Sequence, residues 1–413
     1  MSKIQKIKGF ADMFRQDADV FTYLENTARE VFGRYGFGEL RTPVLEKTEL
    51  FQKSIGEDTD VVGKEMYTFP DRKGRSLTMR PEATAGMVRA FIESKEYQPG
   101  RICKYFSTGP MFRYERPQKG RLRQFHQLDV EIFGAPEAQA DAELILMLTT
   151  FLNEIGLKKL AVELNSLGCH DCRPAYRQAL TDYYTSKNRE EFCEDCRRRI
   201  DTNPMRVLDC KVPTCKELVK DAPSIADHLC DECEQHFADV KAVLDGAGVE
   251  YVLNPRLVRG LDYYVRTTYE ITSNDIGSQT AVAGGGRYDG LVLNLGGPDC
   301  PGTGFACGME RLALLLGERE APAPDFYLAV VEKDAGNQAM IFAQQMREKG
   351  LSGDVSYGGG SMKSRMRAAN KSGAKACLII GQDEFENGTV TVKDMAGDND
   401  QYTIKREEYL KSL

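Results

Sequence analysis

The chain of 413 residues has no apolar run long enough to cross a bilayer, and residues 1–10 contain neither an apolar core nor a cleavage site. We therefore expect no membrane span and no signal peptide, and we predict a cytoplasmic protein. Internal repeats and low-complexity tracts are also absent, which excludes a repeat architecture. The content of 41% hydrophobic and 28% charged residues is that of a globular protein, and the length predicts two or three domains.

An excess of positive charge is missing too. The formal net charge is −7, which argues against general affinity for nucleic acids. Affinity for phosphates follows local clusters of lysine and arginine, however, and the sequence has two of them. One cluster consists of Arg113, Arg116, Lys119, Arg121 and Arg123 around the single acid Glu115, and the other of Lys363, Arg365, Arg367, Lys371 and Lys375. Each is either a solvated face or a surface that binds nucleic acid.

The N-terminal half predicts a helix followed by strands. Residues 17–35 carry apolar side chains at helical spacing, and the glycines at 36 and 38 end this helix before a predicted strand at 40–45. Residues 106–113 and 124–133 predict two more strands, joined by a polar loop at 114–123.

The strand at 124–133 has a regular alternation of apolar and polar residues. Leu128, Val130 and Ile132 point to one side, so that Gln127, Asp129 and Glu131 point to the other. A polar stripe of this kind is typical of a strand face exposed to solvent.

Residues 164–248 hold eight of the 12 cysteines of the chain, in four close pairs. The pairs are Cys169 with Cys172, Cys193 with Cys196, Cys210 with Cys215, and Cys230 with Cys233. In a cytoplasmic protein such pairs favour zinc over disulfides. Charged helical runs at 190–200 and 227–244 surround them. Two interpretations stay open here, structural Zn²⁺ and a set of reduced thiols in a helical domain.

The C-terminal part follows a predicted linker at 321–325 with two prolines. It alternates strands and helices, which indicates a small α/β domain. The predicted strands are 326–331, 376–380 and a hairpin of 389–395 with 401–405, and the predicted helices are 335–349 and 361–372.

Three segments carry the strongest functional signal. They read Leu-Val-Arg-Gly-Leu-Asp-Tyr-Tyr at 257–264, Ala-Gly-Gly-Gly-Arg-Tyr-Asp-Gly at 283–290 and Gly-Thr-Gly-Phe-Ala-Cys-Gly-Met-Glu-Arg at 302–311. The first runs into a predicted strand at 265–271. The glycine run in the second lacks the Lys-Ser/Thr ending of a P-loop, so it indicates close backbone approach or tight strand packing. Together the segments resemble the histidine-specific and class-defining motifs of the histidyl-tRNA synthetases, a class II aminoacyl-tRNA synthetase family.

This resemblance, which covers nearly the whole chain, implies the fold class. We expect an α+β class II synthetase catalytic core, an antiparallel sheet flanked by helices, with a helical insertion and a C-terminal α/β anticodon-binding domain. The catalytic domain would span 1–324, interrupted by the cysteine-rich insertion at 164–248, and the anticodon-binding domain would span 325–413. In this fold the polar stripe of strand 124–133 would be the floor of the amino-acid pocket.

The resemblance also implies the substrates and the residues that bind them. Histidine binding is expected at Glu82, Thr84, Arg113, Gln127, Glu131, Arg259, Tyr263, Tyr264 and Tyr288, and ATP binding at Arg113, Glu115, Arg121, Phe125 and Arg311. Arg259 and Arg113 are expected to be catalytic, because the planar guanidinium grips carboxylate and phosphate and stays charged. For the tyrosines, packing in the core is the alternative role.

Further expectations concern cofactors and partners. ATP would act with Mg²⁺, and the partners would be L-histidine, histidine tRNA and a second copy of the chain in a homodimer. Contacts with the tRNA are expected from Arg116, Gln118, Lys119, Lys363, Arg365 and Arg367. Two rivals are a regulatory paralogue of histidine biosynthesis, which lacks the anticodon-binding domain, and a synthetase for glycine, proline or threonine. The intact segment 257–264 argues against both.

Overall fold

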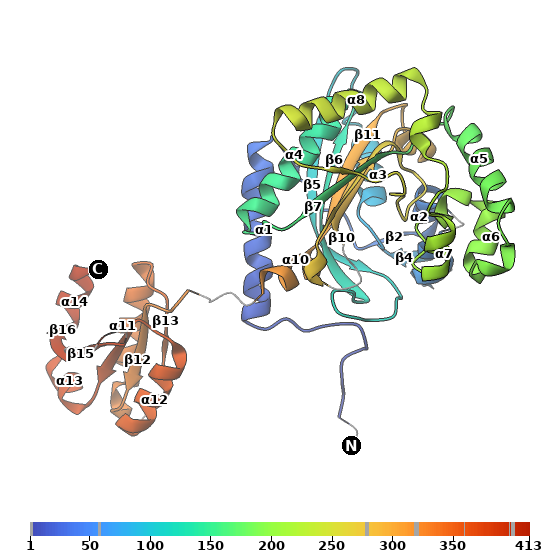
Figure 1. Ribbon diagram of the computed structural model, residues 1–413. Coiled ribbons are helices and arrows are strands. Elements are labelled where there is room, and N and C mark those ends of the chain that lie inside the picture. Colours follow the sequence, from blue (N-terminus) through green and yellow to red (C-terminus); the bar gives the residue numbers. More distant parts are fainter. Residues whose placement is uncertain are drawn as a thin grey trace. The chain divides into compact units, whose positions relative to one another are not determined.

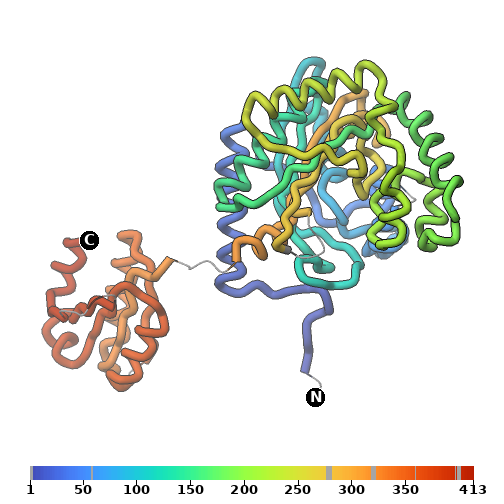
Figure 2. The backbone as a smooth tube through the Cα atoms, viewed as in Figure 1, coloured from blue at the N-terminus to red at the C-terminus, as the bar shows by residue number. Residues whose placement is uncertain are grey.

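The computed structural model describes residues 3–56, 59–276, 281–317, 322–358, 360–395, 397 and 401–413. The chain forms two compact units, residues 1–319 and 320–413 (Figures 1 and 2). The first residue of the predicted linker, Ala321, and part of the turn in the predicted hairpin lie outside the described residues.

A sheet forms the centre of the first unit (Figure 1). Its eight described strands lie in the order β1-β5-β6-β11-β10-β9-β7-β8. The strands are β1 (Gly38–Glu39), β5 (Cys103–Phe112), β6 (Gln124–Phe133), β7 (Ala161–Ser166), β8 (Val252–Leu253), β9 (Val265–Thr272), β10 (Ala281–Arg287) and β11 (Gly302–Gly308). The six central strands, β5, β6, β11, β10, β9 and β7, pair antiparallel with their neighbours. The edge strands β1 and β8 pair parallel with β5 and β7. The expected antiparallel core sheet is therefore confirmed, with a short parallel strand added at each edge.

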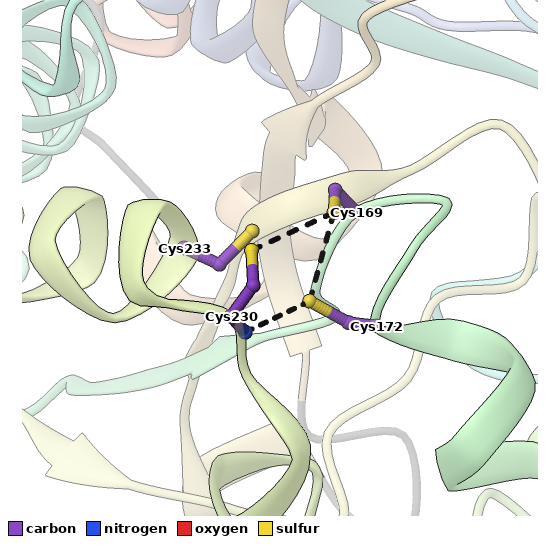
Figure 3. A group of neighbouring side chains, drawn as sticks. All are labelled: Cys169, Cys172, Cys230 and Cys233. Carbon is purple, nitrogen blue, oxygen red and sulfur yellow. Dashed lines mark hydrogen bonds between the residues drawn. The ribbon is translucent and has the colours of Figure 1, made fainter.

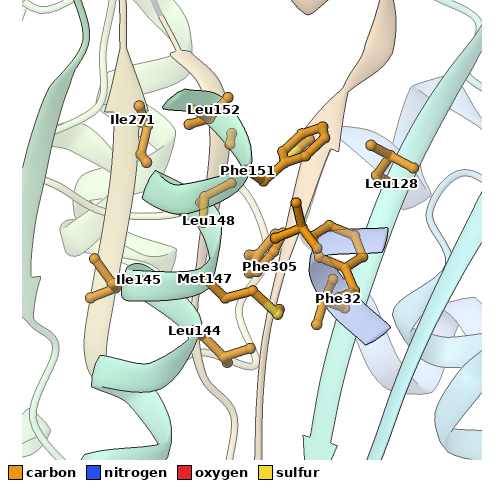
Figure 4. Close-up of a cluster of buried hydrophobic side chains, with 14 of the residues drawn as sticks. Phe32, Leu128, Leu144, Ile145, Met147, Leu148, Phe151, Leu152, Ile271 and Phe305 are labelled. Atoms are coloured by element: carbon orange, nitrogen blue, oxygen red, sulfur yellow. The ribbon is translucent and has the colours of Figure 1, made fainter. Parts of the chain in front are cut away.

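One face of this sheet carries the main apolar core, which four helices cover. They are α1 (Gln16–Arg34), α4 (Ala138–Glu154), α8 (Asp231–Gly246) and α10 (Met309–Leu316). Helix α1 forms because its apolar residues repeat at helical spacing and its first turn is acidic, which suits the helix dipole. Its Phe32 packs against Phe151 of α4 and Phe305 of β11, with ring centroids 5.5 and 6.0 Å apart (Figure 4).

The predicted strand at 40–45 is wrong. The chain instead forms β1 and then, after a gap, β2 (Leu45–Lys47), which belongs to a small sheet with β4 (Ser76–Met79) and β3 (Tyr67–Pro70). Pro43 has no N–H to donate to a ladder, and the carbonyl of Thr42 accepts a hydrogen bond of 3.1 Å from the buried Arg80 instead. The proline thus marks the place where the chain leaves one sheet for the other.

The cysteine-rich segment is helical, as predicted, and its helices before α8 pack on the other face of the sheet. Its helices are α5 (Arg173–Thr185), α6 (Glu194–Thr202) and α7 (Pro213–Leu218), and the chain then returns through α8. Their buried side chains share one apolar cluster with α3 (Thr84–Ser94) and α9 (Leu291–Asn294). Helix α2 (Thr48–Ile55) lies beside α3.

The second unit has a mixed sheet in the order β13-β12-β14-β15-β16 among its described residues. Its elements are β12 (Phe326–Val330), α11 (Gly336–Glu348), β13 (Gly353–Val355), α12 (Met362–Ser372), β14 (Ala376–Ile380), α13 (Gln382–Asn387), β15 (Thr389–Asp394), β16 (Gln401–Lys405) and α14 (Arg406–Ser412). Every strand and helix predicted from the sequence is present in this unit, and β13, α13 and α14 are additional. No helix in the described parts of the chain is both long and apolar enough to span a membrane.

Candidate functional site

A cavity of about 560 Å³ opens on the face of the main sheet opposite the apolar core. Every residue that the sequence predicted to bind histidine or ATP lines it: Glu82, Thr84, Arg113, Glu115, Arg121, Phe125, Gln127, Glu131, Arg259, Tyr263, Tyr264, Tyr288 and Arg311. These residues come from positions 82 to 311 of the sequence, so the fold brings distant segments together at one place.

The polar stripe of β6 forms part of the cavity lining. Gln127, Asp129 and Glu131 line the cavity, while the intervening apolar residues of β6 belong to the core on the other face. Asp129 and Glu131 are each only 1% exposed, so this face is not the solvent-exposed one that such alternation usually indicates. Buried polar atoms need partners, and among the described residues Gln127 Oε1 and Asp129 Oδ2 have none.

Glu131 lies at the bottom of this stripe, between two hydroxyl donors. Thr84 Oγ1 donates to its Oε1 at 2.6 Å and the Tyr288 hydroxyl donates to its Oε2 at 2.5 Å. Its register partner on β11 is Gly304, where a Cβ would collide with the carboxylate. Burial raises the pKa of Glu131 well above its ordinary range.

Glu82 lines the cavity and also accepts hydrogen bonds from the first residues of α3. Its two carboxylate oxygens accept hydrogen bonds from the backbone N–H groups of Thr84 and Ala85, at 2.7 and 2.9 Å. A carboxylate at this position satisfies free N–H groups at a helix N-terminus. Burial raises the pKa of Glu82, and these hydrogen bonds oppose that rise.

Arg259 lies in the loop before β9 and reaches over the glycine-rich strand β10. Its Nη1 forms an ion pair with Glu270 of β9, whose register partner is Gly284. A Cβ at Gly284 would collide with the Arg259 guanidinium, so only glycine leaves room for it. Burial alone would lower the pKa of Arg259, but the Glu270 carboxylate outweighs it and the pKa is raised. The buried Nε has no hydrogen-bond partner among the described residues.

The remaining arginines surround Phe125 and the loop 114–123. The Arg113 guanidinium lies 5.3 Å from the centroid of the Phe125 ring, and its Nε donates to the Pro81 carbonyl at 2.9 Å. Arg121 forms an ion pair with Glu115, and Arg311 Nε donates to the Gly120 carbonyl at 3.4 Å. Burial lowers the pKa of Arg113 and of Arg311. With Arg259, and with Arg199 and Arg206 of the insertion, six arginines among the described residues line this one cavity.

Six carboxylates that line the cavity among the described residues were missed by the site prediction: Asp60, Asp129, Asp195, Asp209, Glu270 and Glu310. Asp129 was noted as part of the alternation of β6 but received no role, and Glu270 and Glu310 received none. Burial and the neighbouring Glu82 raise the pKa of Asp129 well above its ordinary range. Glu310 accepts from the backbone N–H of His126 at 3.0 Å. Conversely, Arg287 of the glycine-rich segment does not line the cavity, because it is buried in an ion pair with Asp141 of α4 at 2.9 Å.

The residues predicted to contact tRNA lie outside the cavity lining. Arg116, Gln118 and Lys119 are exposed on the loop 114–123. Arg123 stabilises that loop by a cation–π contact, because its guanidinium lies 3.9 Å from the centroid of the Tyr114 ring.

Of the residues predicted to contact tRNA in the second unit, Lys363 and Arg367 are exposed on α12. Arg365 is half-buried, and its Nε donates to the Val330 carbonyl at 3.0 Å. Arg365 is therefore held by a hydrogen bond to the protein backbone, for which Lys363 and Arg367 have no counterpart among the described residues.

The eight cysteines of the insertion gather into two groups of four. The first group, which we call the outer tetrad, is Cys169, Cys172, Cys230 and Cys233 (Figure 3). The second group, the inner tetrad, is Cys193, Cys196, Cys210 and Cys215. Within each group the four Sγ atoms lie within 4.8 Å of one another, and all eight thiols are free. Cys193 and Cys210 of the inner tetrad also line the cavity.

Comparisons with known proteins agree with this geometry. Residues 9–312 match the family model described as histidyl-tRNA synthetase, and residues 325–413 match an anticodon binding domain. The histidine–tRNA ligase of Maridesulfovibrio salexigens is 63% identical over 412 residues, which cover 100% of both chains. That of Nitratidesulfovibrio vulgaris is 62% identical over 407 residues, covering 98% of this chain and 97% of the relative.

Solved structures give the same result. The crystal structure of apo S. aureus histidyl-tRNA synthetase is 35% identical, has a TM-score of 0.81 and covers 99% of both chains. The histidyl-tRNA synthetase of Nostoc sp. shares the fold at 19% identity, with a TM-score of 0.69 and 99% coverage of both chains. By its sequence, its fold and the residues of its cavity, the chain belongs to the histidyl-tRNA synthetase family.

Proposed function

We propose that this protein is a histidine–tRNA ligase. It activates L-histidine with ATP to form histidyl-adenylate and pyrophosphate, and then transfers histidine to the 3′ end of histidine tRNA. One observation carries the proposal beyond family membership. Among the described residues, a single cavity holds buried acceptors without partners at Gln127 and Asp129 and a buried donor without a partner at Arg259. The ammonium and carboxylate groups of an amino acid would complete this pattern.

We propose that the imidazole of histidine binds beside Glu131. A carboxylate can accept from an imidazole N–H, and the hydroxyl of Tyr264 can serve the other ring nitrogen. Tyr263, Tyr264 and Tyr288 surround the place, with Tyr263 4.6 Å from Tyr264 and 5.6 Å from Tyr288 between ring centroids. A wrong amino acid would leave these buried groups unpaired, which supports discrimination of roughly 10⁴–10⁵ without an editing step.

The α-amino group is assigned to Glu82, Thr84 and Gln127, with Asp129 as an additional acceptor. Asp129 and Glu82 both have raised pKa values through burial, and the positive charge of an ammonium group would favour their ionised forms. A bound amino acid therefore completes the electrostatics of this end of the cavity.

The arginines are assigned to the anionic groups. Attack of the histidine carboxylate on the α-phosphate builds negative charge on that phosphate, so catalysis consists of positioning and fixed positive charge. Arg259 and Arg113 would contact the α-phosphate, and Arg311 the γ-phosphate. Phe125 would stack on adenine, with Glu115 and Arg121 in the loop beside it. Mg²⁺ would neutralise the triphosphate, and the carboxylates of Glu270 and Glu310 offer the oxygen ligands that it prefers.

The proposal extends to the partners and to the domain limits of 1–324, 164–248 and 325–413. We propose that Arg116, Gln118 and Lys119 read the acceptor end of the tRNA, and that Lys363, Arg365 and Arg367 bind its anticodon side. A cytoplasmic homodimer is part of the same proposal. The small sheet supports self-association, because Leu45 on β2 and Phe69 on β3 are 43% and 42% exposed. Sedimentation analysis tests the dimer directly.

We also propose structural Zn²⁺ at the outer and inner tetrads. Thiolates are zinc ligands, and in each tetrad the four Sγ atoms are close enough for one tetrahedral ion. The regulatory paralogue is not favoured, because residues 325–413 match an anticodon binding domain.

Histidine-dependent exchange of labelled pyrophosphate into ATP tests the activity. Histidine should support exchange, while glycine, proline and threonine should not. The assignment is wrong if one of those three supports exchange and histidine does not. Charging of histidine tRNA by the same preparation tests the second step separately.

A further inference from the structure

The two cysteine tetrads are nested in the chain. The outer tetrad takes its ligands from the two ends of the insertion, at 169–172 and 230–233, and the inner tetrad takes all of its ligands from between them. An ion at the outer tetrad would close the insertion at its base. An ion at the inner tetrad would fix the chain within that closed loop.

The geometry of both tetrads fits a tetrahedral ion. Four thiolates at the usual Zn–S distance of about 2.3 Å lie about 3.8 Å apart in a tetrahedron. The Sγ–Sγ distances in the structure include 3.6 Å for Cys169–Cys172, 3.9 Å for Cys169–Cys230 and 3.8 Å for Cys193–Cys210. A disulfide needs about 2.05 Å, so these spacings are those of metal ligands rather than of bonded sulfurs.

Backbone donors also favour thiolates at these places. The N–H of Cys230 donates to Cys172 Sγ and the N–H of Cys193 donates to Cys215 Sγ, each at 3.2 Å. Such N–H donors stabilise sulfur in the form that binds zinc.

The outer tetrad adjoins the start of β9, the strand that follows Tyr264. The N–H of Arg266 donates to the Gly168 carbonyl at 2.8 Å, one residue before Cys169. Arg173, one residue after Cys172, donates to the Tyr264 carbonyl. The base of the insertion is thus bonded to the segment that carries the proposed histidine pocket.

The inner tetrad reaches the cavity through the chain between two of its ligands. From residue 196 to residue 210 this segment forms most of α6 and a short 3₁₀ turn at Pro204–Val207. Its polar contacts to the catalytic core include Arg199 with Asp60 at 2.9 Å, Asn203 with Asp262 at 3.3 Å, and Arg206 Nη1 with the Arg259 carbonyl at 2.7 Å. Two of these contacts, those of Asn203 and Arg206, hold the loop 257–264 itself.

We propose that the zinc ion of the inner tetrad positions Arg259 for adenylate formation. The ion would fix both ends of the segment 196–210, and Arg206 within that segment holds the backbone of Arg259. The Arg259 side chain has to sit over Gly284, where there is no spare room. A shift of the loop by about 1 Å would therefore remove the guanidinium from its working place, and shifts of that size are costly in catalysis. Arg206 is therefore a positioning residue, which acts through Arg259. The inference rests on the proposed zinc and on the proposed role of Arg259.

Metal content is the first part of the test. Protein purified without added zinc should contain two zinc ions per chain by mass spectrometry. Cys215→Ser and Cys233→Ser should each contain one, and Cys300→Ser, a buried cysteine outside both tetrads, should keep two. Wild-type protein with less than about a tenth of a zinc ion per chain, and with thiols that react freely, overturns the inference.

The second part measures coupling between the ion and the loop. Arg206→Ala should keep both zinc ions and the wild-type melting temperature, yet lower kcat for histidine-dependent exchange about tenfold, with a smaller effect on KM for ATP. Arg206→Lys should recover part of the loss. In a Cys215→Ser background, Arg206→Ala should add less than about a twofold further loss, because the contact has already been released. Additive losses in this cycle overturn the inference.

A readout without catalysis separates this inference from the proposed function. Amide hydrogen exchange of the segment 257–264 should rise in Arg206→Ala and in Cys215→Ser, while strand β12 of the second unit stays unchanged. If wild type shows no histidine-dependent exchange but the segment responds in this way, the proposed function fails and the positioning role stands. If the segment does not respond in folded Arg206→Ala, the positioning role fails even when the enzyme is active.

Discussion

Arg259 is the side chain on which the proposed chemistry depends most. We predict that Arg259→Ala lowers the rate of adenylate formation by roughly 10²–10³, the loss typical of one contact to charge that develops in the transition state. Single-turnover release of pyrophosphate measures this rate. Arg75→Ala, which removes an exposed arginine paired with Asp71 outside the cavity, is the matched control and should leave the rate unchanged.

The second chemical step distinguishes a catalytic arginine from a structural one. Transfer of histidine from preformed adenylate to tRNA should suffer much less in Arg259→Ala than adenylate formation does. An unchanged rate of adenylate formation in a folded Arg259→Ala protein removes Arg259 from the catalytic set.

Glu131 gives a prediction about pH. Because burial raises its pKa, folded protein binds a proton that the unfolded chain releases, between about pH 4.3, the ordinary value for glutamate, and the raised folded-state pKa. Stability of the wild type therefore falls as pH rises through this window. We predict that Glu131→Gln, which cannot titrate, gains stability relative to wild type by up to about 1.4 kcal/mol per pH unit.

Urea unfolding of both proteins at several pH values in that window measures the difference. The slope against pH is the readout, since the lost or altered hydrogen bonds from Thr84 and Tyr288 shift both ends of the window equally. Glu250→Gln, at an exposed glutamate, should show no such slope relative to wild type. A flat difference for Glu131→Gln would show that Glu131 is ionised throughout.

Sequence motifs identified residues that the fold brings together in one cavity, and the histidine and ATP roles assigned to them from their motif positions stay predictions. They did not reveal the importance of Asp129 or Glu270, since a carboxylate in a strand is as often exposed as buried. Burial and register decide these two cases. Glu270 becomes informative once β9 is paired with β10 and Gly284 stands opposite it. Arg365 is the reverse case. The sequence predicted a tRNA contact for Arg365 just as for Lys363, but in the fold the Arg365 side chain donates a hydrogen bond to the Val330 carbonyl.

At the scale of elements, the loop 114–123 separates two functions. Arg116 and Lys119 are exposed, whereas Arg123 lies on the Tyr114 ring and donates to the Glu115 carbonyl at 3.1 Å. We predict that Arg116→Ala with Lys119→Ala raises KM for tRNA several-fold and leaves histidine-dependent exchange unchanged. Arg123→Ala should disturb both, because it releases the loop beside the proposed adenine site. Equal effects of the two variants on exchange would contradict this division.

Strands and helices were predicted correctly where the periodic pattern of hydrophobic residues extends over many positions. The prediction failed where a single residue, such as a proline, interrupts backbone hydrogen bonding. The strands β5, β6, β9 and β12 follow clear patterns and were predicted within a few residues. The strand predicted at 40–45 was wrong because Pro43 and Arg80 divert its backbone bonds. Strand β13 and helices α13 and α14 are too short for a period to show, so only their packing defines them.

At the scale of the whole molecule, the two units should divide the work of tRNA charging. Lys363 and Arg367 are exposed, so we predict that replacing both by Ala raises KM for tRNA and flattens its dependence on salt. Each lost phosphate contact lowers the salt slope by about 0.7–0.9. Histidine-dependent exchange should stay near wild type, because activation precedes use of the tRNA. Initial charging rates across a series of salt concentrations measure both effects.

Arg365→Ala is the informative companion variant. It should also lower the melting temperature of residues 325–413, because it removes the bond to the Val330 carbonyl. Removal of residues 326–413 should weaken charging further while exchange persists. Charging at full-length rate and affinity by a truncated, folded protein would leave the basic residues of α12 as a solvated face.

Three arginines of the cavity, Arg113, Arg121 and Arg311, have a consequence for the protein in the absence of substrate. Burial lowers the pKa of Arg113, Arg121 and Arg311, and Arg121 and Arg113 further lower that of Arg311 by mutual repulsion. Burial and mutual repulsion therefore lower the stability of the folded state until an anion enters the cavity. Neutral, space-filling replacements in this cluster would therefore give a sturdier protein and a poorer enzyme. Nucleotide would act on the native protein as a counter-charge as much as a substrate.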